Sequence, residues 1–236
     1  MSRPISVLKL HLTKRMYVFG VPALILGLVI GITMLIAVGM SRFGVDTSTT
    51  EYIEGIRYNS GVLWSLPGFL VYLGVQAVST TFPFGMSLGT TRRAYSLGTA
   101  LYFALQATYV SVLSVALYGV ERLTNHWFLN AYALDVNALG APNVFAIAAT
   151  VFTLTFFALT IGGLFGALYV KAGSRGPLIL AMTLALVLVM LLVILAPHLT
   201  AIISALTRWS VLGIALALSV AAVIGEYFSL RTATVR

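Results

Sequence analysis

The stretch FPFGMSLGTTRRAYSLGT, residues 82–99, decides the fold of this chain. Apolar runs long enough to cross a bilayer flank it on both sides, and it carries the pair Arg92 and Arg93 between Gly89 and Gly98. An arginine in hydrocarbon costs about 2.5–3.5 kcal/mol on insertion scales, so we expect this stretch to lie in water between two membrane spans. Because loops rich in lysine and arginine stay in the cytoplasm, we place it on the cytoplasmic side.

The composition of the whole chain points to a bilayer as its solvent. Of its 236 residues, 60% are hydrophobic and 8% are charged, and the mean hydropathy is +1.02. Soluble domains carry about 25% charged residues. The net charge of +8 comes from loops and tails, which favours contact with anionic lipid and disfavours binding of nucleic acid. The chain has no cysteine, which excludes disulfides and cysteine-ligated metals.

Six apolar runs have the length of about 20 residues that a helix needs to cross a bilayer. We therefore predict an all-α integral membrane protein with a single transmembrane domain over residues 1–236. The segment 200–206 is apolar but too short to cross, so it is either a re-entrant turn or an extension of a neighbouring span. The predicted spans are 17–39, 62–82, 94–120, 143–170, 177–196 and 209–225.

The N-terminal segment before the first span is basic and partly amphipathic. Ile5, Leu8 and Leu12 share one helical face, and Pro4 suits a first helical turn. We predict a helix over residues 4–15 that lies in the inner membrane interface, with a disordered basic tail as the alternative.

The loop charges give the orientation of the spans. If both termini are cytoplasmic, only Glu226 among the six acidic residues lies inside, where we expect it to pair with a neighbouring arginine at the end of the last span. The bias agrees at every pair of loops, so we expect a multi-pass protein of a bacterial inner membrane with both termini in the cytoplasm. Ten of the fourteen basic residues then lie inside: Arg3, Lys9, Lys14, Arg15, Arg92, Arg93, Lys171, Arg175, Arg231 and Arg236.

Small and polar residues within the spans suggest contacts between helices. Gly27 and Gly31 have the spacing that lets a second helix approach closely, and we predict a dimer contact there. Polar side chains in the second and third spans either bond to neighbouring helices or line a path for a transported compound. They are Gln76, Ser79, Thr80, Gln106 and Thr108.

Motifs for catalysis or metal binding do not occur in the sequence. Neither the GxxxxGK[ST] phosphate-binding loop nor HExxH is present, so we predict no catalytic residue, no metal site and no cofactor. The three acidic residues Asp46, Glu51 and Glu54 do not have the spacing of a calcium loop. No ionisable residue falls in the middle of a predicted span, which disfavours a carrier driven by protons or sodium.

The residues of the central stretch resemble those of a known family. Phe84, Gly89, Arg92, Arg93 and Gly98 follow the pattern F-x-x-x-x-G-x-x-R-R-x-x-x-x-G. This pattern is similar to the inner loop of membrane permeases of type-2 ABC exporters, the bacterial relatives of the ABCG-like fold. The resemblance extends over nearly the whole chain through its six spans, basic N-terminal segment and interrupted region between the last two spans.

The resemblance implies a transmembrane subunit that exports an amphipathic or hydrophobic compound such as a drug, lipid or peptide. Two permease copies, identical or sister chains, would combine with two copies of a cytoplasmic ABC ATPase, which binds ATP and magnesium. A short cytoplasmic coupling helix between the second and third spans would contact the ATPase through Ser87, Leu88, Gly89, Thr90, Thr91, Arg92, Arg93 and Tyr95. The alternatives are a membrane scaffold or regulatory subunit that transports nothing, and an independent ion-coupled carrier.

Overall fold

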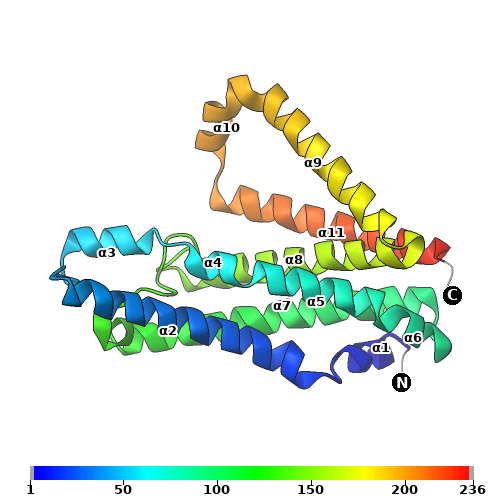
Figure 1. The fold of residues 1–236 in the computed structure, drawn as a ribbon, viewed down its shortest axis with the longest axis horizontal. Helices are drawn as coiled ribbons and strands as arrows, with labels where there is room; N and C mark the ends of the chain where they lie inside the picture. The colour runs from blue at the N-terminus through cyan, green and yellow to red at the C-terminus, as the bar shows by residue number, and fades with distance from the viewer. Residues whose placement is uncertain (1–2, 234–236) are drawn as a thin grey trace. The chain divides into compact units, whose positions relative to one another are not determined.

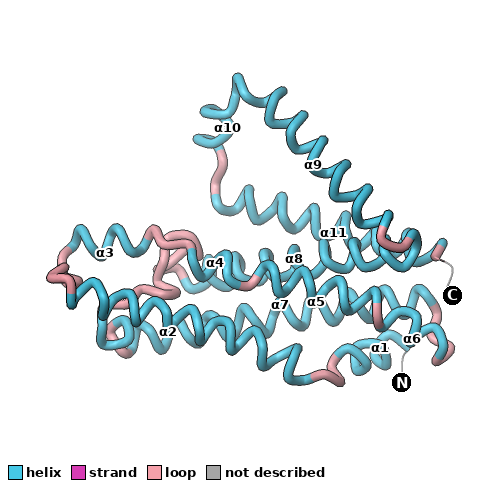
Figure 2. Tube along the Cα trace, viewed as in Figure 1, coloured by secondary structure: helices cyan, strands magenta, loops and turns pink. Residues whose placement is uncertain are grey.

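The computed structural model describes residues 3–233, and all regular elements in this range are helical (Figures 1 and 2). Ser2 and Arg236, which belong to the predicted cytoplasmic ends, lie outside the described residues. Six helical segments of the described range are long and apolar enough to cross a membrane, which confirms the prediction of an all-helical chain with six spans. They are Met16–Arg42, Thr50–Ser87, Arg92–Leu123, Val144–Ala172, Arg175–Ala205 and Arg208–Thr232.

The first span combines the short π-helix η1 (Met16–Gly20) with α2 (Val21–Arg42). Pro22 stands in the first turn of α2, where its missing N–H leaves no hydrogen bond unmade. Before this span, helix α1 covers Arg3–His11, so the predicted N-terminal helix forms but ends four residues earlier than expected. Its place at a membrane interface remains a prediction.

The second span is divided into short rods. It contains α3 (Thr50–Arg57), α4 (Gly61–Ser65), α5 (Pro67–Ser79) and α6 (Thr81–Ser87). Helix α4 ends at Ser65, and although Leu66 keeps helical backbone angles, Pro67 has no N–H with which to continue the hydrogen bonds of this helix. A further break, at Thr80, lies between α5 and α6.

The next two spans are long single helices. Helix α7 covers Arg92–Leu123 and α8 covers Val144–Ala172. The connection between them holds the short helix η2 (His126–Asn130) and then an irregular segment, residues 131–139, most of which is buried.

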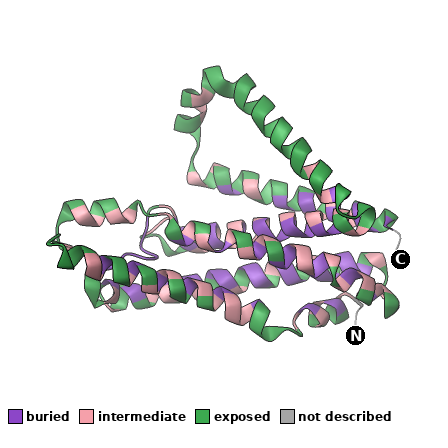
Figure 3. Ribbon diagram, viewed as in Figure 1, coloured by how far each residue is buried: buried purple, intermediate pink, exposed green. Residues whose placement is uncertain are grey.

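The last two spans form a hairpin with an interrupted tip. Helix α9 (Arg175–Leu195) leads into the 3₁₀ turn η3 (Ala196–His198) and the short helix α10 (Leu199–Ala205). Thr207 then caps α11 (Arg208–Thr232) through a reciprocal capping box with Ser210. Segment 200–206 is therefore mostly the separate helix α10, and α9 diverges from α11 (Figure 1). Nearly all residues of α9 are exposed (Figure 3).

The chain divides into two compact units. Unit 1 comprises residues 1–11, 71–103 and 157–236, and unit 2 comprises residues 12–70 and 104–156. Helices α5, α7 and α8 contribute to both units, and each unit is described by itself below. The prediction of one transmembrane domain stays a prediction.

Candidate functional site

The predicted coupling residues begin with a tight turn in unit 1 that joins α6 to α7. Ser87, Leu88 and Gly89 are exposed, and Gly89 has a φ of +75°, a left-handed conformation that favours glycine. The N–H of Thr90 donates to the carbonyl of Gly85 at 3.2 Å, and the N–H of Gly89 donates to the carbonyl of Met86 at 3.0 Å. These are the bonds of a glycine-terminated helix end. The only helix between α5 and α7 is α6, and its role in coupling remains a prediction.

Arg92 and Arg93 have different surroundings. Arg92 is half-buried, and its Nη1 donates to the carbonyl oxygens of Leu230 and Arg231, each at 2.7 Å. These carbonyls belong to the last turn of α11, where a cation satisfies free acceptors and interacts well with the helix dipole. Arg93 is exposed. Arg92 therefore joins the start of α7 to the end of α11, while Arg93 stays on the surface.

Tyr95 does not share the surface of the other coupling residues. It is completely buried, its hydroxyl donates to the carbonyl of Ala77 at 2.6 Å, and it also contacts the hydroxyl of Thr81. Its ring meets Phe82 edge to face, with ring centroids 5.1 Å apart. Tyr95 thus fixes α7 against α5 and α6 from within the core of unit 1.

Helix α1 packs directly against α7 in the same unit. A Cβ atom on Gly98 would lie 2.6 Å from the Cβ of Val7 and 2.7 Å from the carbonyl oxygen of Pro4, so only glycine fits there. His11 hydrogen-bonds to the hydroxyl of Thr99 through Nε2 at 3.1 Å and stacks on Tyr102. Burial lowers the pKa of His11 to about 4, because the charged imidazolium is poorly solvated there.

The polar residues predicted to line a path for a transported compound lie in different surroundings. Ser79 and Thr80 lie on a groove of about 500 Å³ in unit 1, together with Phe165 and Tyr169. This volume is within the range of small-molecule sites. Gln76 is half-buried and does not line this groove.

The other two members of that set belong to unit 2. Gln106 is completely buried, and its Nε2 donates to the carbonyl of Val18 at 2.6 Å, so it bonds between helices. Thr108 is exposed, and its hydroxyl donates to the carbonyl of Ala104 in its own helix. Neither residue lines the groove beside Ser79 and Thr80.

The glycine pairs also differ. Among residues 3–233, nothing lies within 4 Å of a Cβ placed on Gly27 or Gly31, and the predicted dimer contact stays a prediction. In unit 1, a Cβ on Gly162 would collide with the carbonyl oxygen of Val71 and lie 3.0 Å from the Cα of Gly74. Gly162 and Gly166 of α8 therefore allow close contact with α5 inside the chain.

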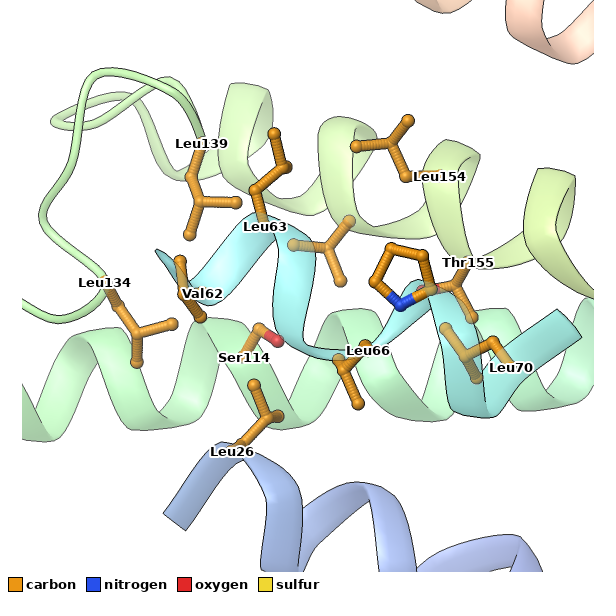
Figure 4. Close-up of a pocket in the computed structure, with 12 residues that line it drawn as sticks. Leu26, Val62, Leu63, Leu66, Leu70, Ser114, Leu134, Leu139, Leu154 and Thr155 are labelled. Carbon is orange, nitrogen blue, oxygen red and sulfur yellow. The ribbon is translucent and has the colours of Figure 1, made fainter. Parts of the chain in front are cut away.

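An apolar cavity in unit 2 is too small to hold cargo. Its volume is about 30 Å³, which suits about one water molecule. Leucine and valine side chains surround it, with the hydroxyl of Ser114 at its edge (Figure 4). The cavity is a packing gap of the core.

An ionic cluster around Asp135 in unit 2 escaped the sequence analysis. Its carboxylate is 1% exposed and accepts hydrogen bonds from Arg57 at 2.8 Å, Arg122 at 3.1 Å and His126 at 3.1 Å. The ring of His126 also stacks on Tyr132, with centroids 3.9 Å apart. The sequence places these groups in loops predicted on one side of the membrane, and this shared side is the signal that could have suggested the cluster.

Glu121 fixes the same segment through its backbone. Its completely buried carboxylate accepts the N–H groups of Ala133 at 3.1 Å, Leu134 at 2.7 Å and Asp135 at 3.1 Å. Buried backbone N–H donors need hydrogen-bond acceptors, and residues 131–139 belong to no helix or strand that would provide such acceptors. Glu121 therefore replaces secondary structure as the partner of this segment.

A run of left-handed residues precedes the buried segment. Asn125, His126, Trp127 and Phe128 have φ between +48° and +60°. Such backbone costs about 1–2 kcal/mol per residue outside glycine, so surrounding contacts must hold it. The bond from His126 to Asp135 and its stacking on Tyr132 are such contacts.

Glu226 contradicts its predicted pairing. The last span extends to Thr232, so Glu226 lies inside α11 and not at the end of the span, and it is 1% exposed. Ion pairs among the described residues all involve Asp135, and the nearby Arg92 donates to backbone carbonyls instead. Within residues 3–233, the prediction that Glu226 pairs with an arginine is therefore wrong. The guanidinium of Arg92 caps the end of α11 instead.

Residues 3–233 hold no group of three or more histidine, aspartate or glutamate side chains that could hold a metal ion. Comparison of the chain with protein-family models, curated proteins and solved structures finds no match.

Proposed function

We propose that this chain is the transmembrane subunit of an ATP-driven exporter in a bacterial inner membrane. A separate cytoplasmic ABC ATPase would bind ATP and magnesium, and a second permease copy would complete the transporter. The cargo class is an amphipathic or hydrophobic compound such as a drug, lipid or peptide. Six apolar spans without a phosphate-binding loop support a division of labour between a membrane subunit and an ATPase.

The proposal depends on the turn of residues 87–91 and on the contacts that join the adjoining helix α7 to α11 and α1. Arg93 beside the turn is exposed and can form charge-assisted hydrogen bonds to carboxylates of a partner. Arg92 links the same end of α7 to α11, and Gly98 packs α7 against α1. A force applied at the turn would therefore reach two further helices of unit 1.

The groove beside Ser79 and Thr80 offers a contact surface for cargo in this proposal. Its other lining residues are mainly apolar, and they include Val71, Val75 and Phe165. An apolar groove with a few hydroxyl groups suits an amphipathic compound. The groove begins on α5, only a few residues before α6 and the turn.

Purification of the tagged chain from its native membrane tests the proposal. We expect an ATPase to co-purify and Arg93→Glu to lower the retained ATP hydrolysis about tenfold, because hydrogen bonds to charged groups contribute about 1.5–3 kcal/mol. Arg175→Glu is the matched control, since it reverses an exposed charge at another turn of unit 1. The proposal is wrong if no ATP hydrolysis accompanies the chain, or if Arg93→Glu behaves as the control does.

A further inference from the structure

Glu226 is a buried carboxyl group that the proposed function does not use. It is 1% exposed, and its Oε1 is buried without a hydrogen-bond partner. Within residues 3–233, no lysine, arginine or histidine lies within ion-pairing distance of it. This contrasts with Glu121 and Asp135 of unit 2, whose carboxylates accept three hydrogen bonds each.

The surroundings of the carboxyl come from the helices of unit 1. On α8, a Cβ on Gly163 would lie 2.7 Å from Oε2 of Glu226 and 2.8 Å from the ring of Phe103, so this glycine leaves the room that the carboxyl occupies. No residue of α8 between 160 and 167 is titratable. On α7, the buried hydroxyl of Tyr95 is bonded to the carbonyl of Ala77 and to the hydroxyl of Thr81.

Two further charged or titratable groups of unit 1 form hydrogen bonds with partners other than Glu226. Arg92 donates to the carbonyls of Leu230 and Arg231, one helical turn beyond Glu226. His11 of α1 is bonded to Thr99 and stacked on Tyr102. The carboxyl therefore has no counter-charge among the described groups that face it.

A carboxylate buried without a counter-charge costs several kcal/mol, and the group avoids that cost by taking up a proton. A metal cation in place of the proton would need a cage of oxygen ligands. The ring of Phe103 and Gly163 itself border this space beside the carboxyl, and they supply no side-chain oxygen. We propose that Glu226 is a proton-binding site within the membrane and that it carries its proton while α8 and α11 are in contact.

Infrared spectroscopy of the chain alone in lipid nanodiscs tests this site, and it needs no ATPase, so its outcome is independent of the proposed function. We expect a carbonyl band of a protonated carboxyl group at neutral pH, which shifts when glutamate is labelled with carbon-13. The band disappears in Glu226→Gln, a neutral variant of nearly the same shape, and persists in Glu54→Gln, which changes an exposed residue of α3. A glutamate-labelled wild-type chain without this band contradicts the proposal, even if the variant fails to fold.

Carbodiimide labelling gives a second measurement, because this reagent modifies protonated carboxyl groups in apolar surroundings. We expect dicyclohexylcarbodiimide to modify Glu226 in the wild-type chain, with mass spectrometry locating the adduct, and rising pH to slow the reaction. Sodium or potassium chloride should leave the rate unchanged at fixed pH. Protection by either salt would show a metal-cation site and overturn the assignment to a proton.

Discussion

At the scale of single residues, the carboxylate of Glu121 accepts backbone hydrogen bonds that a neighbouring strand would accept in a sheet. Three consecutive N–H groups of a buried irregular segment donate to its two oxygens. The carboxylate of Asp135 accepts hydrogen bonds from two arginines and a histidine, while its own backbone N–H donates to Glu121. The two acidic residues together hold residues 131–139 in unit 2.

Loss of the Glu121 carboxylate should destabilise unit 2. We expect Glu121→Ala to lower the free energy of unfolding by about 3 kcal/mol or more, because each buried donor left without an acceptor costs about 1–3 kcal/mol. Thermal unfolding in detergent measures the change. Glu54→Ala, which alters an exposed residue, should leave the transition within error of wild type. Equal losses in both variants would argue against the described bonds.

His11 predicts an acid-sensitive stability. Its pKa is lowered to about 4 by burial, whereas an unfolded histidine has a pKa of about 6.5. Above about pH 6.5 the ring is neutral in both states and contributes no pH dependence. As pH falls from about 6.5 to 4, the unfolded chain binds a proton that the folded chain does not, so stability declines by about 3 kcal/mol in total.

Melting temperatures recorded across that pH range check this effect. His11→Phe keeps an aromatic ring on Tyr102 and removes the titratable group, so its melting temperature should lose this part of the pH dependence. Replacement of His198, which is exposed at the tip of the last hairpin, serves as the control. A wild-type curve with the same slope as that of His11→Phe would contradict the prediction.

At the scale of elements, glycines divide into those that bring helices together and those on open faces. Gly162 meets Val71 and Gly74 so closely that no side chain fits, whereas Gly27 has open space around it. We expect Gly162→Ala to lower stability by about 1–3 kcal/mol through overpacking. Gly27→Ala should be neutral or slightly stabilising, because alanine is the better helix former.

Thermal unfolding of the two glycine variants in the same detergent provides the measurement. The comparison is matched, because both changes add one methyl group to a glycine of a spanning helix. Equal melting temperatures would show that α5 and α8 do not touch at Gly162.

The end of α11 depends on a residue of another helix. Arg92→Gln removes the guanidinium that donates to Leu230 and Arg231, so the last turn of α11 should fray. We expect faster amide hydrogen exchange in residues 228–232, by about fivefold for a loss of about 1 kcal/mol. Arg93→Gln is the control, because Arg93 is exposed. Exchange that rises equally in both variants would contradict the cap.

At the scale of the whole molecule, the lengths of the apolar runs allowed the number of long helices to be predicted. Six apolar runs identified six helical spans, since a bilayer leaves helices as the structure that satisfies the backbone of such runs. Span ends were less certain: the last helix extends to Thr232, seven residues beyond its predicted end at Gly225, and this placed Glu226 inside a helix. The short helix α10 between the last two spans was foreseen as an interruption.

The candidate sites were less predictable because they depend on contacts far apart in sequence. Arg92 and Arg231 are 139 positions apart, and Arg57 and Asp135 are 78 apart. Local patterns identified Arg92 and Arg93 as a pair, but they could not show that one caps α11 while the other is exposed. The burial of residues 131–139 was also hidden, because a loop with acidic and aromatic residues is typical of a solvated connection.

The left-handed run at Asn125–Phe128 sets a limit on how this connection can vary. Four successive residues there wind in the mirror-image sense of an ordinary helix. Side chains that branch at the β-carbon crowd such backbone most severely, so valine, isoleucine and threonine are excluded from these positions, whereas glycine and asparagine are accommodated. A chemically synthesised chain with D-amino acids at these four positions would adopt the same path without conformational penalty.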